Sequence, residues 1–313
     1  MITDPLLIII GVVQGLLVLL IAPFFSGLVR KLRAKVQSRR GPSIFQNYRD
    51  LAKLMKRQEI LPDQAGWLFR VTPYLTMATM LLVAMIIPIL TVRSPFGWVG
   101  DLILVVYLFA LARFFFSLSG LDSGSSFGGI GARRDLLLSV LIEPVMLLVV
   151  FVMALLAGST NLGIITSKVA SGVVPYYIAV WLGMLAFAFA TFVEMGKLPF
   201  DLAEAEQELQ EGPLTEYSGR GLAVLQWGMY MKQVVLVSLF LAVFIPFGSM
   251  TTFSIPAALW AVVVFFLKAL VFFAIVAFLE NAMARVRFMK ASSVTWVALG
   301  AALLSFVFYL ANV

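Results

Sequence analysis

Long runs of apolar residues, separated by short polar segments, dominate this chain. About eight of them reach the roughly 20 residues that a helix needs to cross the hydrocarbon core of a bilayer. They are Leu6–Phe25, Tyr74–Val92, Leu102–Leu118, Leu136–Ala157, Tyr176–Met195, Leu225–Phe247, Ile255–Leu279 and Val294–Leu310. Apolar residues within each run are continuous rather than alternating, which favours helices over a β-barrel. The pattern predicts an all-α polytopic membrane protein with about eight transmembrane helices, in a single integral membrane domain that spans residues 1–313.

Residues 44–57 follow a helical period instead. Apolar side chains at Ile44, Tyr48, Leu51 and Met55 share one side, and basic residues such as Lys53 occupy the other. This pattern predicts an amphipathic helix that lies at the membrane interface. A basic stretch that ends in Arg39, Arg40, Gly41 and Pro42 precedes it. Two interpretations stay open for these basic residues: topology with anionic-lipid binding, or a docking surface for a cytoplasmic partner.

Composition and charge agree with a membrane protein. The chain is 62% hydrophobic and 12% charged, whereas soluble domains are about a quarter charged. If the N-terminus lies outside, all but three of the 23 Lys and Arg residues fall on inside segments, the exceptions being Arg93, Lys168 and Lys268. Because basic residues favour the cytoplasmic side, we expect both termini outside and the long basic and acidic loops in the cytoplasm.

The chain contains no Cys and no His. Iron–sulfur clusters require Cys, and haem and zinc sites usually rely on His or Cys. We therefore expect no cofactor and no metal on this chain, and no catalytic centre of its own. Nucleic-acid binding is not expected either. If the protein serves redox chemistry, the electrons travel through other subunits.

An acidic segment follows the fifth apolar run. Seven of the 16 carboxylates lie between Glu194 and Glu216. Pro199 and the spacing of Asp201 and Glu204 are typical of a helix start. In such a helix Asp201, Glu204, Glu208 and Glu211 share one face, and Glu206 points away. Crowded carboxylates hold protons more tightly, so proton exchange is one interpretation and a solvated cytoplasmic loop is the other.

Charged residues also fall inside the apolar runs. Glu143 and Lys268 lie too deep for easy snorkelling, so we expect them to pair with each other or to line a wet path. Glu194 ends its run. The glycine-rich segment Gly120–Arg134 lacks the Walker lysine, and we expect an inside loop that ends in Arg133 and Arg134.

The acidic segment also carries a motif. Glu194-Met-Gly-Lys-Leu-Pro-Phe-Asp-Leu-Ala-Glu-Ala-Glu-Gln-Glu-Leu, followed by Glu216-Tyr-Ser-Gly, resembles the signature of the membrane "heel" subunit of respiratory complex I. Arg39-Arg-Gly-Pro and Glu143 match that family too. Phe114-Phe-Phe, Ser119-Gly-Leu-Asp-Ser-Gly-Ser, Ile130-Gly-Ala and Glu206-Gln-Glu-Leu-Gln-Glu-Gly-Pro resemble one branch of it, the membrane subunits of group 4 [NiFe] hydrogenases such as formate hydrogenlyase and hydrogenase-4.

The resemblance implies a membrane anchor and energy-coupling subunit in a bacterial inner membrane. It implies as partners a [NiFe] large subunit, an iron–sulfur small subunit, antiporter-like membrane subunits and lipid, with iron–sulfur clusters and a NiFe centre on the partners. The implied proton or ion path consists of Glu143, Glu194, Asp201, Glu204, Glu206, Glu208 and Lys268. The implied docking residues are Arg39, Arg40, Gly41, Pro42, Arg133, Arg134, Lys197 and Glu216.

Two other functions stay open. The first is a true complex I heel subunit with a quinone site. Met195-Gly-Lys197 replaces the Thr-Asn-Arg of that family, so we expect no quinone reduction and a quinone chamber that is closed or filled by side chains. The second is a stand-alone transporter that uses Lys268 and Glu143. Transporters often show inverted repeats, and no repeat is visible in this sequence.

Overall fold

The computed structural model describes residues 5–97, 99–174, 177–203, 206–286 and 288–311, with backbone alone at 206–207 and 288–292. These residues form helices and no β-strand beyond two isolated bridges. The helices are α1 (Pro5–Val36), α2 (Gln46–Met55), α3 (Trp67–Ile86), α4 (Leu102–Asp122), α5 (Ser126–Ala157), α6 (Leu162–Ala170), α7 (Ile178–Glu194), α8 (Glu206–Leu209), α9 (Gly219–Phe244), α10 (Ile255–Ala282) and α11 (Phe288–Leu310), with a 3₁₀ turn η1 at Gly212–Leu214.

The structure confirms the predicted membrane architecture. Within the described residues, seven helices are long and apolar enough to cross a membrane, and α7 is a shorter apolar helix of 17 residues. Each coincides with one of the predicted runs. The protein is therefore a multi-pass membrane protein. The short helix α6, between α5 and α7, was not predicted, because nine residues are too few to stand out from an apolar background.

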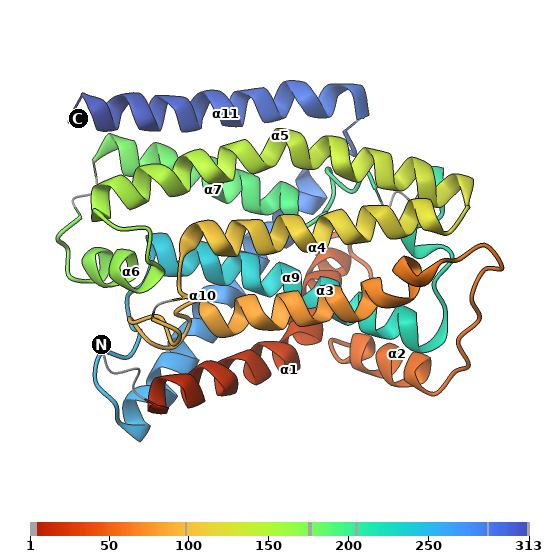
Figure 1. Cartoon of the computed structure of the whole chain (residues 1–313), viewed down its shortest axis with the longest axis horizontal. Helices are drawn as coiled ribbons and strands as arrows, with labels where there is room; N and C mark the ends of the chain where they lie inside the picture. The colour runs from red at the N-terminus through yellow and green to blue at the C-terminus, as the bar shows by residue number, and fades with distance from the viewer. Residues whose placement is uncertain (1–4, 98, 175–176, 204–205, 287, 312–313) are drawn as a thin grey trace.

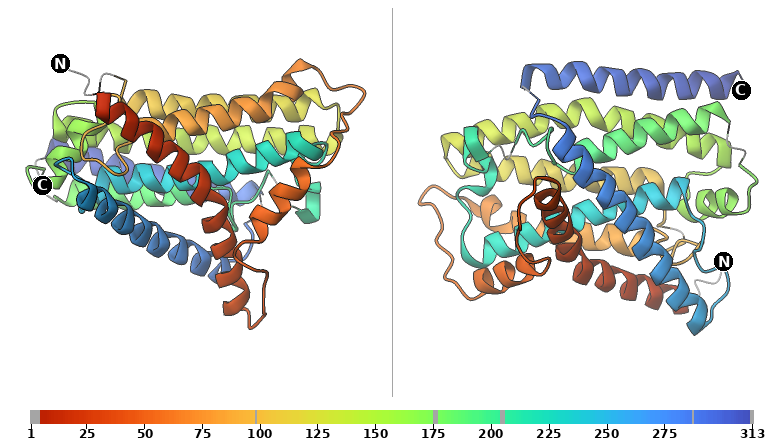
Figure 2. Two further views of the ribbon diagram at one scale, coloured as in Figure 1. Left: turned by 90° about the horizontal axis from the view of Figure 1, so that it is seen from below. Right: turned by 180° about the vertical axis from the view of Figure 1, so that it is seen from behind.

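The helices form a layered bundle around α9. Figure 1 shows α11 lying over α5 and α7, with α4, α3 and α9 beneath them. Helices α1 and α10 run obliquely to the others and pack against each other (Figure 2). Helix α1 begins and α11 ends at one end of the bundle, and α2 lies at the opposite end (Figure 1).

The glycine-rich segment forms a tight helical hairpin, so the prediction of a loop there was wrong. Only Ser123, Gly124 and Ser125 separate α4 from α5. Glycine permits close packing on both sides of this turn. A Cβ at Gly131 would lie 2.7 Å from Cδ of Pro213, which is too close for any side chain. Gly120, Gly128 and Gly131 therefore serve helix packing, and Gly124 supplies the left-handed conformation of the turn with a φ of 68°.

Helix α3 starts and ends earlier than the apolar run predicted. It ends at Ile86, where the amide of Gln14 on α1 donates hydrogen bonds of 3.0, 3.0 and 2.7 Å to the carbonyls of Ala84, Met85 and Ile87. The last carbonyls of a helix have no partner within the helix. Pro88 ends α3, because the residue before a proline disfavours the helical conformation, and Ile87 is extended here. The buried amide of Gln14 then satisfies carbonyls left over at this helix end.

The predicted amphipathic helix is present as α2. Its inner face places Asn47 and Leu51 against the bundle. The side chain of Arg30 donates to Oδ1 of Asn47 at 2.9 Å, and Nδ2 of Asn47 donates to the carbonyl of Pro23 at 3.2 Å. Tyr48 donates to the carbonyl of Leu20. These polar contacts fix α2 to α1, and its basic residues stay on the outer face.

Candidate functional site

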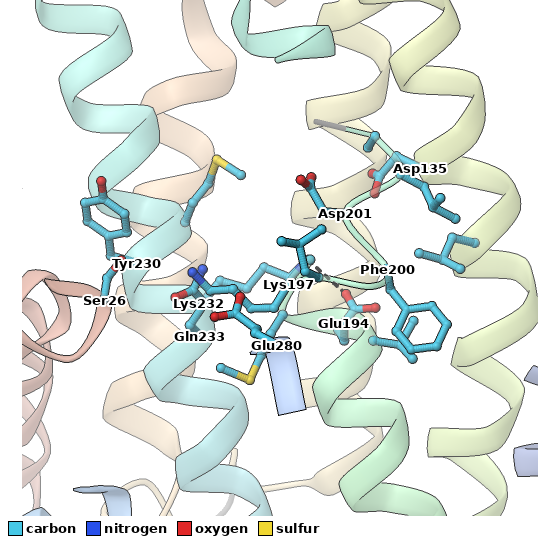
Figure 3. Close-up of a pocket in the computed structure, with 18 of the residues that line it drawn as sticks. Ser26, Asp135, Glu194, Lys197, Phe200, Asp201, Tyr230, Lys232, Gln233 and Glu280 are labelled. Atoms are coloured by element: carbon cyan, nitrogen blue, oxygen red, sulfur yellow. Dashed lines mark ion pairs between the residues drawn. The ribbon is translucent and has the colours of Figure 1, made fainter. Parts of the chain in front are cut away.

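A cavity of about 660 Å³ opens at the end of the bundle where α2 lies. Figure 3 shows acidic and basic side chains from several helices converging on it. Its charged lining residues are Arg30, Arg33, Arg113, Asp135, Glu194, Lys197, Asp201, Glu211, Lys232, Glu280 and Arg285. The cavity is open, so the expectation that this region would be closed or filled was wrong. Side chains of both charges line its walls.

Four charged residues from four helices meet at the inner wall of the cavity. Arg113 on α4 lies between two carboxylates: its Nη1 is 2.5 Å from Oε2 of Glu194 on α7, and its Nε is 3.3 Å from Oδ1 of Asp135 on α5. Lys232 on α9 contacts the other oxygen of Glu194 at 3.0 Å. We call Asp135, Arg113, Glu194 and Lys232 the buried charge cluster. Its formal charges sum to zero.

Burial makes this pairing essential. Arg113 is 6% exposed and Glu194 is 4% exposed. Isolated ions in such surroundings are very costly, and direct pairing with extra hydrogen bonds offsets that cost. Ser117, one turn after Arg113 on α4, supplies one such bond by donating to Asp135 at 3.0 Å. The cluster therefore holds ionic groups inside the apolar part of the bundle.

Sequence reasoning identified Glu194 but missed its partners. Arg113, Asp135 and Lys232 were not among the predicted site residues. Asp135 directly follows Arg133 and Arg134, so its carboxylate resembled part of a loop. A sequence signal was available for Arg113: it is the one charged residue in the apolar run Leu102–Leu118, and a charge within a membrane span almost always faces the bundle interior or a water-filled cavity.

Glu143 lies two turns beyond Asp135 on α5. It is half-buried, and the charged groups that act on it are Arg113, Glu194, Lys232 and Asp135. Glu143 is therefore electrostatically linked to the cluster, although it does not line the cavity.

Lys268 does not pair with Glu143, so that prediction was wrong. Its ammonium donates to the carbonyl of Ile245 at 2.7 Å and to the carbonyl of Phe247. Both carbonyls follow the end of α9 at Phe244, where unsatisfied carbonyls carry the negative end of the helix dipole. Lys168 does the same at the end of α5, where it donates to the carbonyl of Ala157 at 2.6 Å. These lysines cap helix ends.

The predicted acidic helix from Pro199 to Glu211 is not formed. Residues 195–203 are irregular, and α8 covers only Glu206–Leu209. The buried side chain of Phe200 packs edge-on against Phe189 and Phe192, with ring centroids 5.5 and 6.1 Å apart. Burial of Phe200 holds the chain in an irregular path that helix propensity alone would not give.

The acidic side chains consequently do not share one helical face. Asp201 pairs with Arg285 at 3.1 Å, and both line the cavity. Glu208 pairs with Arg134 at 2.5 Å. Glu280 on α10 was missed; it is buried, and Lys197 and Arg33 are the cations that act on it. Glu204 and the side chain of Glu206 lie outside the described residues.

Residues of the motif Glu216–Gly219 make contacts that hold the fold together. Tyr217 stacks on Phe69 with ring centroids 3.9 Å apart and donates to the carbonyl of Phe69 at 2.9 Å. Burial raises the pKa of the Tyr217 phenol, so it stays protonated. Ser218 exchanges hydrogen bonds of 2.8 and 2.7 Å with the backbone of Ile60. These contacts pin the loop after α2 to the start of α9.

The residues predicted to dock a partner lie around the same end of the bundle. Arg39, Arg40, Gly41 and Pro42 are exposed between α1 and α2, and Arg133 is exposed at the start of α5. Lys197 and Glu216 are partly exposed. Their docking role stays a prediction. In the described part of the chain, no group of three or more acidic residues is placed to hold a metal ion.

Comparisons with known proteins agree with this architecture. Residues 8–310 match the NADH dehydrogenase family. Hydrogenase-4 component C of Escherichia coli (strain K12) is 49% identical over 98% of this chain and 97% of its own length. Formate hydrogenlyase subunit 4 of the same strain is 50% identical over 96% of this chain and 97% of its own length. A subunit of the NADH-quinone oxidoreductase of Methylococcus capsulatus is 29% identical, over 91% of each chain.

Among solved structures, a similar chain occurs in the membrane-bound sulfane sulfur reductase, an archaeal respiratory membrane complex. The two chains superpose with a TM-score of 0.81 at 23% identity, covering 94% of this chain and 99% of the other. At that identity the likeness shows a shared fold.

Proposed function

We propose an anchoring and energy-coupling role for this chain, which belongs to the NADH dehydrogenase family, in a membrane complex built around a [NiFe] hydrogenase. Its half-identical relatives are named as components of hydrogenase-4 and formate hydrogenlyase. In this proposal the chain holds a water-soluble arm, made of a [NiFe] large subunit and an iron–sulfur small subunit, against the membrane. The redox centres sit on those partners, and antiporter-like subunits are the neighbours in the membrane.

The observation that carries the coupling role is the buried charge cluster. It lies between a charged cavity open at one end of the bundle and Glu143 inside the membrane domain. A unit charge that arrives about 10 Å from a carboxylate, at an effective dielectric constant near 20, changes its energy by about 1.7 kcal/mol. That is roughly one pKa unit. Electron arrival in the arm would then alter protonation at the cavity, and the cluster would pass the change toward Glu143.

The proposed arrangement places the cavity mouth and the basic loop on the cytoplasmic side of a bacterial inner membrane, with both termini outside. Arg39, Arg40 and Arg133 then face the arm or the anionic headgroups. The ion pair between Asp201 and Arg285 lines the cavity and is partly exposed, so a docked subunit could contact it. The acidic and basic side chains that line the cavity favour bound water over apolar ligands, and this supports proton entry through the cavity.

Purification from native membranes tests the assembly. The tagged full-length chain, solubilised in mild detergent, should carry a [NiFe] large subunit, an iron–sulfur subunit and antiporter-like membrane subunits, identified by mass spectrometry. Recovery of NADH-oxidising subunits would replace this proposal with the complex I alternative. Recovery of the chain alone, with solute transport in vesicles, would favour a transporter.

The alternative of a complex I subunit with a quinone site draws support from the open cavity and from the 29% identical relative. Quinones are bound by pockets with largely apolar walls. The cavity instead presents Arg113, Lys232 and Glu280, together with several other titratable side chains. We therefore propose turnover without quinone: hydrogen evolution by the purified complex should need no added quinone and should resist quinone-site inhibitors. Quinone-dependent turnover would overturn this assignment.

A further inference from the structure

Helix α1 forms part of the cavity wall and also faces outward from the bundle. Ser26 and Arg30 line the cavity, whereas Leu20, less than two turns before Ser26, is 62% exposed on the outer surface. Helix α9 supplies the adjoining wall, and Figure 3 shows its Tyr230 at the same side of the cavity as Ser26. The contact between α1 and α9, which we call the α1–α9 seam, therefore separates the charged cavity from the apolar outer surface.

A proline interrupts the backbone hydrogen bonding of α1 at this seam. Pro23 has no N–H, so the carbonyl of Leu19 loses its partner within the helix, and α1 bends part-way along its length (Figure 2). The indole N–H of Trp227 on α9 donates to that carbonyl at 2.9 Å. The side chain of Trp227 is partly buried against the core of the bundle. Trp227 therefore crosses the seam and replaces the hydrogen bond that the proline removes.

Helix α2 lies across the outside of the seam. It packs against both α1 and α9, and among the described residues that line the cavity none belongs to α2. Tyr48 donates to the carbonyl of Leu20, and Nδ2 of Asn47 donates to the carbonyl of Pro23 at 3.2 Å. Three side chains from α2 and α9 therefore hold α1 where its own hydrogen bonding is interrupted.

We propose that Trp227, Tyr48 and Asn47 close the α1–α9 seam and keep bilayer-soluble amphiphiles, such as lipid tails and quinones, out of the cavity. The cavity is then open to water at the end of the bundle and shut to the membrane. Trp227 is the main barrier. Opening the seam would leave the carbonyl of Leu19 without a donor in an apolar environment, which is costly. This inference concerns access to the cavity, and it goes beyond the proposed coupling role without depending on it.

The absence of cysteine from the chain allows a direct test. Met229→Cys places a single thiol on the cavity wall that α9 forms. The assembled complex in liposomes is treated either with a sulfonated maleimide, which stays in water, or with N-dodecylmaleimide, which partitions into the bilayer. Labelling of this chain is followed by mass spectrometry. With Trp227 in place, we expect the sulfonated reagent to label the thiol readily and the dodecyl reagent to label it slowly.

Variants of the seam should change only the access from the bilayer. Trp227→Ala should raise the rate of labelling by N-dodecylmaleimide by roughly tenfold or more, because both the ring and the hydrogen bond are lost. Trp227→Phe and Tyr48→Phe each remove one hydrogen bond and should raise that rate about fivefold. Labelling by the sulfonated reagent should stay unchanged. Trp260→Ala, at a tryptophan of α10 that is 64% exposed, is the control and should label at the parent rate.

Two results would overturn the proposal. One is rapid labelling by N-dodecylmaleimide with Trp227 in place, which means a seam that is open to the bilayer. The other is slow labelling by this reagent in Trp227→Ala while the sulfonated reagent reacts normally. If Trp227→Ala misfolds, both reagents label it faster, and the two phenylalanine variants decide instead. The result does not depend on which subunits are recovered with the chain, so the seam proposal can fail while the proposed function stands.

Discussion

Replacing Arg113 with methionine should destabilise the membrane domain strongly. Arg113 is 6% exposed and contacts Glu194 at 2.5 Å and Asp135 at 3.3 Å. Methionine fills similar space but removes the charge, so among the described residues Glu194 keeps Lys232 as its ion-pair partner and Asp135 keeps the hydrogen bond from Ser117. Removing one partner from a buried ion pair costs about 3–5 kcal/mol. On the scale of about 2 °C per kcal/mol for large domains, the midpoint of thermal unfolding should fall by about 6–10 °C.

Intrinsic fluorescence of the detergent-solubilised protein, which has six tryptophans, follows this unfolding. The nearby exposed Arg133→Met is the matched control, and it should change the midpoint little because exposed charges contribute little to stability. The double variant Arg113→Met with Glu194→Gln removes a charge of each sign. Its loss of stability should be smaller than the sum of the two single losses by about 0.5–3 kcal/mol. Additive losses, or a single variant as stable as wild type, would refute the ionic coupling inferred for the cluster.

Three further perturbations test other contacts. Lys268→Met should lower stability by about 1–3 kcal/mol by exposing unpaired carbonyls at the end of α9, and its effect should add to that of Glu143→Gln; a non-additive cycle would restore the pairing that the structure contradicts. Gly131→Ala should impair folding, judged by detergent-resistant yield, because its Cβ would meet Pro213 at 2.7 Å, whereas Gly129→Ala, whose nearest atom is 3.7 Å away, should be tolerated. Arg39→Ala with Arg40→Ala should release the water-soluble arm at lower salt than wild type; identical retention across a salt titration would assign both arginines to topology or lipid.

Much of the fold was accessible from the sequence. Each predicted apolar run corresponds to a helix, because a helix needs about 20 consecutive apolar residues to cross a bilayer, and runs of that length are easily found in a sequence. The helical period of apolar residues between 44 and 57 predicted helix α2, and the motif around Glu194 indicated the family. Boundaries were less accurate. The end of α3 at Ile86 is marked in the sequence by Pro88, a stop signal that was not used when the run was extended to Val92 on hydropathy alone.

The site was only partly accessible. Local pattern favoured a helix from Pro199, but burial of Phe200 and the pairing of Asp201 with Arg285 decide the path of that segment. The buried charge cluster draws one residue from each of four helices, and no short stretch of sequence contains two of them. Lys268 stood out as a charge deep in an apolar run. Its partners are backbone carbonyls. Every residue carries a carbonyl, so the sequence does not show which ones Lys268 contacts.

The central claim is that charge at the cavity is coupled to ion movement through Glu143. The most direct measurement compares wild type and Glu143→Gln as assembled complexes in proteoliposomes, recording hydrogen evolution and ion uptake together. The neutral amide keeps the shape of the side chain and removes its titratable group. Glu59→Gln, at an exposed carboxylate, serves as control. We predict that Glu143→Gln assembles normally and loses most ion uptake, or loses uptake and hydrogen evolution together. Wild-type rates of both in Glu143→Gln would contradict the account.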